Sequence, residues 1–141
     1  MLFRNFVLVD NSSIFVYTYT GRLHLNPRFV GSQTQIVNLT NKNISLGLDV
    51  LAIRDYVDQT IIHLFDLMPG VSRQEEPFTI HSKTQIIEIS VCRAGDVDDQ
   101  YLVFIDANHD LYLTSCRNGP EFPLYKIGTI CLVFVKKNFI L

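Results

Sequence analysis

The stretch Leu102-Val-Phe-Ile-Asp106-Ala-Asn-His-Asp-Leu111-Tyr-Leu-Thr114 contains two apolar runs joined by a short polar break. Short runs rich in β-branched and aromatic residues are typical of β-strands. Asp and Asn in the break favour a turn, because their side chains bond to nearby backbone groups and tolerate left-handed conformations. The stretch therefore predicts a β-hairpin.

The same design occurs three times along the chain. The two earlier copies are Phe6-Val-Leu-Val-Asp10 with Ile14-Phe-Val-Tyr17, and Leu51-Ala-Ile-Arg-Asp55 with Ile61-Ile-His-Leu-Phe65. The aspartates are separated by 45 residues (10 to 55) and by 51 residues (55 to 106), close to the period of roughly 40 to 50 residues of a four-stranded propeller blade. A blade buries its faces only against neighbouring blades, so three copies indicate part of a larger ring.

We therefore predict an all-β fold, a partial WD40-like β-propeller of about three antiparallel blades in an incomplete ring. Residues 1–130 are expected to form it, with blades at about 1–30, 31–80 and 81–128, followed by a divergent apolar tail at 131–141. The first blade is expected to lack an inner strand and the third to be nearly whole. Beyond the central hairpins, the pattern predicts strands at residues 23–25, 36–39, 44–46, 77–80, 86–91 and 122–127. An open arc leaves one blade face uncovered at each end, so we expect the chain alone to be poorly soluble or oligomeric.

Composition excludes several other classes of protein. The chain is 48% hydrophobic and 18% charged, which is too apolar for a disordered segment. The formal charge of −2, without a basic cluster, gives no electrostatic reason to expect nucleic acid as a partner. The longest apolar run, at residues 130–135, is far shorter than the roughly 18 to 20 residues that cross a bilayer, so no membrane insertion is expected. The first ten residues lack the pattern of a signal peptide, and we expect an intracellular chain that is soluble in the sense of not being inserted into a membrane.

The polar residues give little reason to predict catalysis. Asp10, Asp55 and Asp106 are interpreted as structural turn residues, and no catalytic, cofactor-binding or metal-binding residue is predicted. The four histidines, His24, His63, His81 and His109, have no metal-site spacing, and neither do the three widely separated cysteines, which are interpreted as reduced strand residues. No Gly-rich phosphate loop or nucleophile elbow occurs. No cofactor is expected.

Two other functions of the chain stay open, and one acidic segment has two interpretations. A small intracellular β-domain that acts as a hydrolase or binds a ligand would use Asp106 and His109. A secreted β-domain would use the glycosylation sequons that begin at Asn11, Asn38 and Asn43. The acidic residues 96–99 are typical of a solvated turn, with a docking patch for a basic partner as the other interpretation.

Four sequence strings carry a resemblance to a known family. They are Leu8-Val-Asp-Asn-Ser-Ser-Ile14 with Tyr17-Thr-Tyr-Thr-Gly-Arg22, the second copy of the hairpin, His81-Ser-Lys-Thr-Gln-Ile-Ile-Glu-Ile89, and Phe104-Ile-Asp-Ala-Asn-His-Asp-Leu-Tyr-Leu-Thr-Ser115. In this order and spacing they resemble the second propeller of the eighty-kilodalton WD-repeat subunits of intraflagellar transport complex B. The strings cover most of residues 6–129.

The resemblance implies a scaffold without a cofactor. Proteins of this family have two propellers followed by helical repeats, and they assemble with other intraflagellar transport B subunits on trains that motors carry along cilia. The resemblance therefore implies protein partners, a place in the cilium, at the ciliary base or in the cytoplasm, and a role in cilium assembly.

The chain also departs from the family pattern. It has no Trp, and Phe65-Asp66 is nearest to the Trp-Asp that usually ends a WD blade, which leaves the Trp-based hydrogen-bond network in question. The family carries a whole propeller before the equivalent of Met1 and a helical region after the equivalent of residues 128–129. We therefore expect a truncated or mis-spliced product or a gene-model fragment.

Overall fold

Three antiparallel sheets follow one another along the chain. The computed structural model describes residues 5–10, 13–27, 39–68, 77–93, 99–116 and 124–129. Sheet 1 contains β1 (Asn5–Val9), β2 (Ile14–Thr18) and β3 (Leu23–Leu25) in that order. Sheet 2 contains β4 (Ile44–Leu46), β5 (Val50–Arg54), β6 (Ile61–Asp66) and β7 (Phe78–His81) in that order. Sheet 3 contains β8 (Ile86–Arg93), β9 (Gln100–Asp106), β10 (Asp110–Ser115) and β11 (Tyr125–Thr129) in that order.

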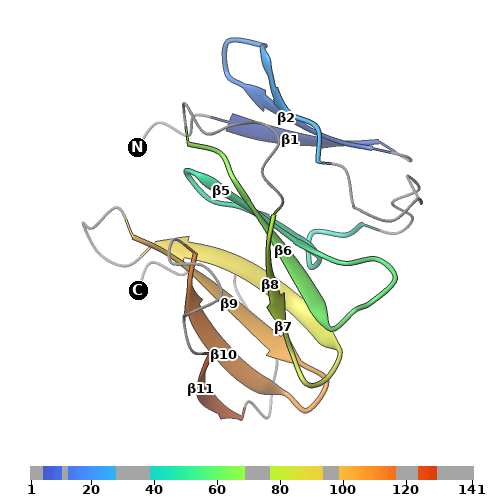
Figure 1. Ribbon diagram of the computed structural model, residues 1–141, viewed down its shortest axis with the longest axis vertical. Coiled ribbons are helices and arrows are strands. Elements are labelled where there is room, and N and C mark those ends of the chain that lie inside the picture. The colour runs from blue at the N-terminus through green and yellow to red at the C-terminus, as the bar shows by residue number, and fades with distance from the viewer. Residues whose placement is uncertain are drawn as a thin grey trace.

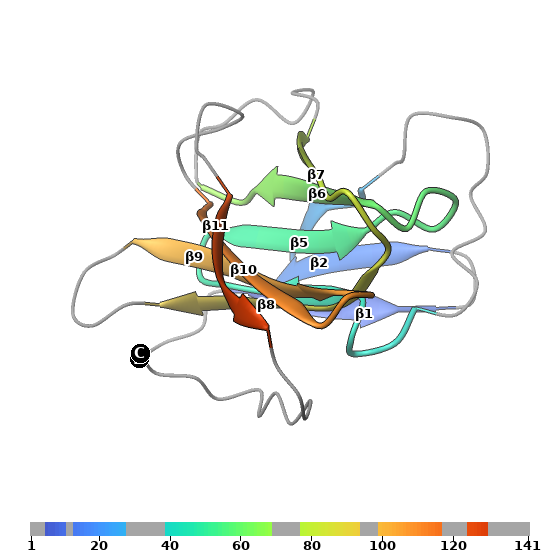
Figure 2. The same cartoon turned by 90° about the horizontal axis from the view of Figure 1, so that it is seen from below.

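The sheets stack into an arc. Figure 1 shows sheet 1 in blue at one end, sheet 2 in the middle and sheet 3 in yellow to red at the other end. Seen from below, β10 and β11 lie in front of β5, with β2 behind it (Figure 2). Every described element is a strand or a turn, and the described sheets form no closed ring. The prediction of an all-β, partial propeller with antiparallel blades is confirmed.

Strand β5 is buried on both faces because sheet 2 lies between the other two sheets. Successive side chains of a strand point to opposite faces. Accordingly, Val50 and Ala52 belong to the apolar cluster shared with sheet 3, whereas Leu51 and Ile53 belong to the cluster shared with sheet 1. The cluster between sheets 2 and 3 also contains Ile62, Leu64, Ile86, Ile89, Leu102, Phe104 and Cys116. The cluster between sheets 1 and 2 also contains Ile14, Val16, Phe65 and Leu67.

The strands β1, β5 and β9 occupy equivalent positions in the three sheets. β1 and β5 end one residue before Asp10 and Asp55, and β9 ends with Asp106. β5 and β9 have inner neighbours, β4 and β8, whereas no described strand pairs with the other side of β1. Sheet 2 is as complete as sheet 3, although the sequence pattern singled out only the third blade as nearly whole. The sequence pattern does predict strands at 44–46 and 77–80, close to where the short strands β4 (3 residues) and β7 (4 residues) lie.

Strand β11 lies further along the chain than the sequence pattern predicts. The prediction was 122–127, but β11 spans Tyr125–Thr129. Two contacts of Asp110 in β10 hold β11 in place. Its carboxylate accepts a hydrogen bond from the Thr129 hydroxyl (2.6 Å) and lies 2.7 Å from the Lys126 ammonium. Most of the strand predicted at 36–39, the acidic residues 96–98 and the tail at 131–141 lie outside the described residues, and the blade limits remain predictions.

Candidate functional site

The turn after β9 is organised around the carboxylate of Asp106. Oδ1 accepts hydrogen bonds from the backbone N–H groups of Asn108 (2.9 Å) and Asp110 (3.0 Å), and Oδ2 accepts one from the Thr84 hydroxyl (2.7 Å). His109 completes the turn with a φ of 62°, and its N–H donates to the Asp106 carbonyl. Asp106 is 1% exposed, and the bonds of its carboxylate are buried or partly buried.

The turn after β5 uses Asp55 in a similar way. Oδ1 accepts from the N–H groups of Val57 and Asp58, both at 2.8 Å, while Oδ2 lies 2.7 Å from Nε2 of His63. Burial acts to raise the pKa of Asp55, but the hydrogen bonds from His63 and from the two backbone groups outweigh it. The pKa of Asp55 therefore lies below its usual value.

The turn after β1 is the most exposed of the three. Asp10 Oδ1 accepts one hydrogen bond from the N–H of Ser13 at 2.7 Å, and the Asp10 N–H donates to the Ser13 carbonyl at 3.0 Å. These contacts are exposed to solvent. The three aspartates thus occupy equivalent turns but differ in burial, since the Asp106 side chain is buried and the Asp10 turn is exposed.

Asp106 and His109 share one turn without forming a catalytic pair. Both carboxylate oxygen atoms of Asp106 accept bonds from the turn or from Thr84. The His109 side chain is exposed, and no described hydrogen bond joins it to Asp106. A general base needs an oxygen or nitrogen within reach of its substrate's proton, so this geometry does not favour the hydrolase alternative.

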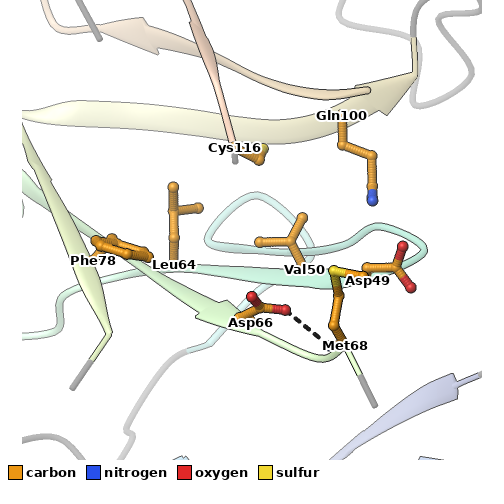
Figure 3. Close-up of a pocket in the computed structure, with 8 residues that line it drawn as sticks. All are labelled: Asp49, Val50, Leu64, Asp66, Met68, Phe78, Gln100 and Cys116. Atoms are coloured by element: carbon orange, nitrogen blue, oxygen red, sulfur yellow. Dashed lines mark hydrogen bonds between the residues drawn. The ribbon is translucent and has the colours of Figure 1, made fainter. Parts of the chain in front are cut away.

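A cavity of about 290 Å³ lies between sheets 2 and 3 (Figure 3). Sheet 3 contributes Gln100 and Cys116, and the opposite side comes from sheet 2 and its flanking residues. The lining residues are Asp49, Val50, Leu64, Asp66, Met68, Phe78, Gln100 and Cys116. Burial raises the pKa of the Cys116 thiol to about 12, so the thiol stays protonated near neutral pH and is a poor nucleophile.

The face of sheet 1 turned away from sheet 2 is aromatic. We call Phe6, Leu8, Phe15, Tyr17 and Tyr19 the aromatic face. Phe6 stacks on its cross-strand partner Tyr17 with ring centroids 5.6 Å apart, and Leu8 lies opposite Phe15. Leu8 is 49% exposed and Tyr19 is 64% exposed. Exposed apolar patches of this kind commonly mark contact sites for other proteins.

Sequence reasoning missed the partners of the turn aspartates and the whole cavity. His63 carries a usable signal, because it is a polar residue inside the apolar run of β6. Thr84 and Gln100 have no such signal, since Thr84 meets an aspartate 22 positions away and Gln100 accepts from the Leu48 N–H, 52 positions away. Pairings over such distances follow from sheet stacking, which no local pattern specifies.

Metal sites, membrane-spanning helices and glycosylation sequons are the other features to consider in the described residues. Among the described residues, no group of three or more His, Cys, Asp or Glu side chains is arranged to hold a metal ion. No helix long and apolar enough to span a bilayer occurs in the described part of the chain. Of the three sequons, Asn43 lies in a described turn before β4, whereas Asn11 and Asn38 lie outside the described residues.

Comparison with known proteins identifies the family. The model of the family described as IFT80 second beta-propeller matches residues 2–136. The intraflagellar transport protein 80 homolog of Mus musculus is 38% identical over 128 residues, which is 90% of this chain and 16% of the mouse protein. The homolog of Rattus norvegicus is 37% identical over the same shares. The chain thus spans 16% of the length of these curated relatives and belongs to the family of the IFT80 second β-propeller.

Proposed function

We propose that the chain is a non-enzymatic scaffold and protein-interaction module of the intraflagellar transport B complex. In this role it supports cilium assembly and the transport of cargo along the axoneme. Its partners are other intraflagellar transport B subunits, bound through protein contacts, without nucleic acid and without insertion into a membrane. Its place is the cilium and ciliary base, together with the cytoplasm that supplies them.

The observation that carries this proposal is the match of the family model to residues 2–136. The geometry of sheet 1 supports it, because the aromatic face presents exposed rings to solvent. Rigid aromatic side chains provide contact area at low conformational cost and are enriched in protein interfaces. The turn carboxylates support it too. The carboxylate of Asp106 accepts hydrogen bonds from the backbone of its own turn, which is a structural role.

The test is affinity purification of the tagged chain from ciliated mouse cells, followed by mass spectrometry. We expect intraflagellar transport B subunits to be enriched over a control purification with an unrelated propeller. Phe6→Ser combined with Tyr19→Ser is expected to reduce this enrichment, whereas Tyr125→Ser is the matched control because Tyr125 is 61% exposed at the other end of the arc. Absence of every transport subunit from the wild-type purification would contradict the proposal.

A further inference from the structure

The cavity between sheets 2 and 3 has the size of a side-chain pocket. Its volume of about 290 Å³ is just below the roughly 300 to 1,000 Å³ of pockets that enclose drug-sized ligands and cofactors. Val50 and Leu64 form a buried apolar floor, and Phe78 and Met68 stand at the rim with 45% and 42% of their surfaces exposed. The shape therefore suits one long side chain with an apolar stem.

The polar lining of this pocket is acidic. Asp49 and Asp66 place two carboxylates on it, and none of the described residues that line it is basic. Asp49 already has another interaction within the chain, so Asp66 is the carboxylate that an occupant would meet. Asp66 Oδ1 accepts the Met68 N–H at 2.8 Å, while Oδ2 bonds to no described residue. Exposed Asp99 precedes Gln100 in the sequence, and Arg93 lies across from Gln100 on β8, so these two charges offset each other near the opposite wall. A positively charged group is the complementary occupant.

Gln100 provides a hydrogen-bond donor that the fold leaves unused. Its side chain is 2% exposed, and its oxygen accepts the Leu48 N–H at 2.7 Å. The amide nitrogen points into the pocket (Figure 3) and donates to no described residue. The nitrogen is not one of the fully buried side-chain atoms that lack a partner, so it reaches the open space of the pocket, where an acceptor on an occupant can bond to it. A peptide carbonyl is such an acceptor.

From these three features we propose that the pocket binds an arginine side chain of a partner polypeptide. The aliphatic stem packs on Val50 and Leu64, and the planar guanidinium lies against the ring of Phe78 and donates to the Asp66 carboxylate. A backbone carbonyl of the same segment accepts from Gln100. Arginine fits better than lysine because its flat, multi-donor head can serve a carboxylate and stack on an aromatic ring at once.

The inference rests on the proposed function, since it names the chemistry by which one partner is recognised. It is tested with the full chain by NMR titration, following the methyl signals of Val50 and Leu64 and the side-chain amide of Gln100. The probe is acetyl-Gly-Arg-Gly-amide. The control peptide replaces arginine with citrulline, which has nearly the same shape but no charge.

We expect the arginine peptide to shift all three sets of signals and the citrulline peptide to bind at least about fivefold more weakly, because a charge-assisted bond at a partly solvated rim is lost. Asp66→Asn should weaken arginine binding by a similar factor while keeping the acceptor for Met68. Asp58→Asn removes the same charge at the opposite end of β5 and β6 and is expected to leave binding unchanged.

Three results would overturn the proposal: equal binding of both peptides, no shift at Gln100, or equal effects of Asp66→Asn and Asp58→Asn. The outcome is separable from the proposed function. If transport subunits copurify but the titration fails, only the arginine pocket is wrong. If the titration succeeds but no transport subunit copurifies, only the assignment to intraflagellar transport is wrong.

Discussion

The contact between sheets 2 and 3 and the contact between sheets 1 and 2 differ in one element, the inner strand β8. The β8 N–H groups of Ile89 and Val91 donate to the Lys42 carbonyl and the Ser45 hydroxyl of the neighbouring sheet, both at 2.9 Å. The Arg54 guanidinium donates back to the Ile86 carbonyl at 2.6 Å. Sheets 2 and 3 are thus joined by hydrogen bonds as well as by an apolar cluster.

Sheet 1 has no described strand in the position of β8. It packs on sheet 2 through the apolar side chains of Ile14 and Val16, which meet Leu51 and Ile53. The inner strand β8 thus does more than complete its own blade, since its backbone also bonds to the preceding blade. We therefore expect sheets 2 and 3 to unfold as one unit and sheet 1 to open more easily.

The largest expected effects come from truncating one buried isoleucine in each contact. Ile89 is 2% exposed and Ile14 is 0% exposed, and changing a buried isoleucine to alanine typically costs about 2 to 5 kcal/mol. Ile89→Ala should lower the free energy of global unfolding by this amount. Ile14→Ala should mainly destabilise sheet 1. Urea unfolding combined with amide exchange distinguishes the two variants, and an equal loss of protection throughout the chain in both would contradict the comparison.

Gly47→Ala is expected to have the next largest effect. An added Cβ would lie 2.0 Å from Gln100 Oε1 and 2.8 Å from a Val91 methyl, so β8 must shift or the Gln100 bond to Leu48 must break. Overpacking and the loss of a buried hydrogen bond together predict a cost of about 2 to 4 kcal/mol. Gln100→Ala in the same chain should remove part of this cost, because the clash disappears. If the losses in unfolding free energy of Gly47→Ala and Gln100→Ala simply add in the double variant, the two residues are not coupled.

The three turn aspartates are expected to give smaller, graded effects. Asp106→Ala should cost on the order of 1 to 2 kcal/mol, as for loss of a side-chain cap, and Asp106→Asn should cost less because it keeps an acceptor oxygen. Asp10→Ala should cost about 0.5 kcal/mol, at the low end for a lost side-chain cap, because its turn is exposed to solvent. Thermal melts measure all three. Unchanged stability together with a lost activity or bound metal would instead support a catalytic or metal-binding Asp106.

The smallest expected effect is a pH dependence at Asp55. Because the pKa of Asp55 lies below its usual value in the folded chain, the folded state binds this proton less readily than the unfolded state does. The stabilisation is therefore present above about pH 4, the unfolded value, and is lost as the pH falls through the lowered pKa. Melting temperatures from acidic to neutral pH should show this loss in the wild type and a flatter profile in Asp55→Asn. If the melting temperatures of the wild type and of Asp55→Asn change with pH in parallel, Asp55 does not cause the pH dependence.

Local features of the fold were predictable from the sequence, and long-range features were not. The hairpins whose turns begin at Asp55 and Asp106 were predictable, because each has two apolar runs with a polar break between them. The spacing of the repeats predicts stacked blades. Residues such as Gly47 and Gln100 acquire their roles only when two sheets meet. The arginine pocket depends on the same meeting, because Asp66 and Gln100 come from different sheets. No periodicity within one strand contains that information.

Strand β8 is expected to join sheets 2 and 3 into one unit to which sheet 1 is less firmly attached. Native-state amide exchange tests it most directly, because exchange reports the free energy of opening at each N–H group. We predict that the N–H groups of Ile89 and Val91 exchange only through global unfolding, whereas those paired between β1 and β2 exchange through an opening of lower free energy. Equal protection of both sets, or faster exchange at Ile89 and Val91, would contradict the claim.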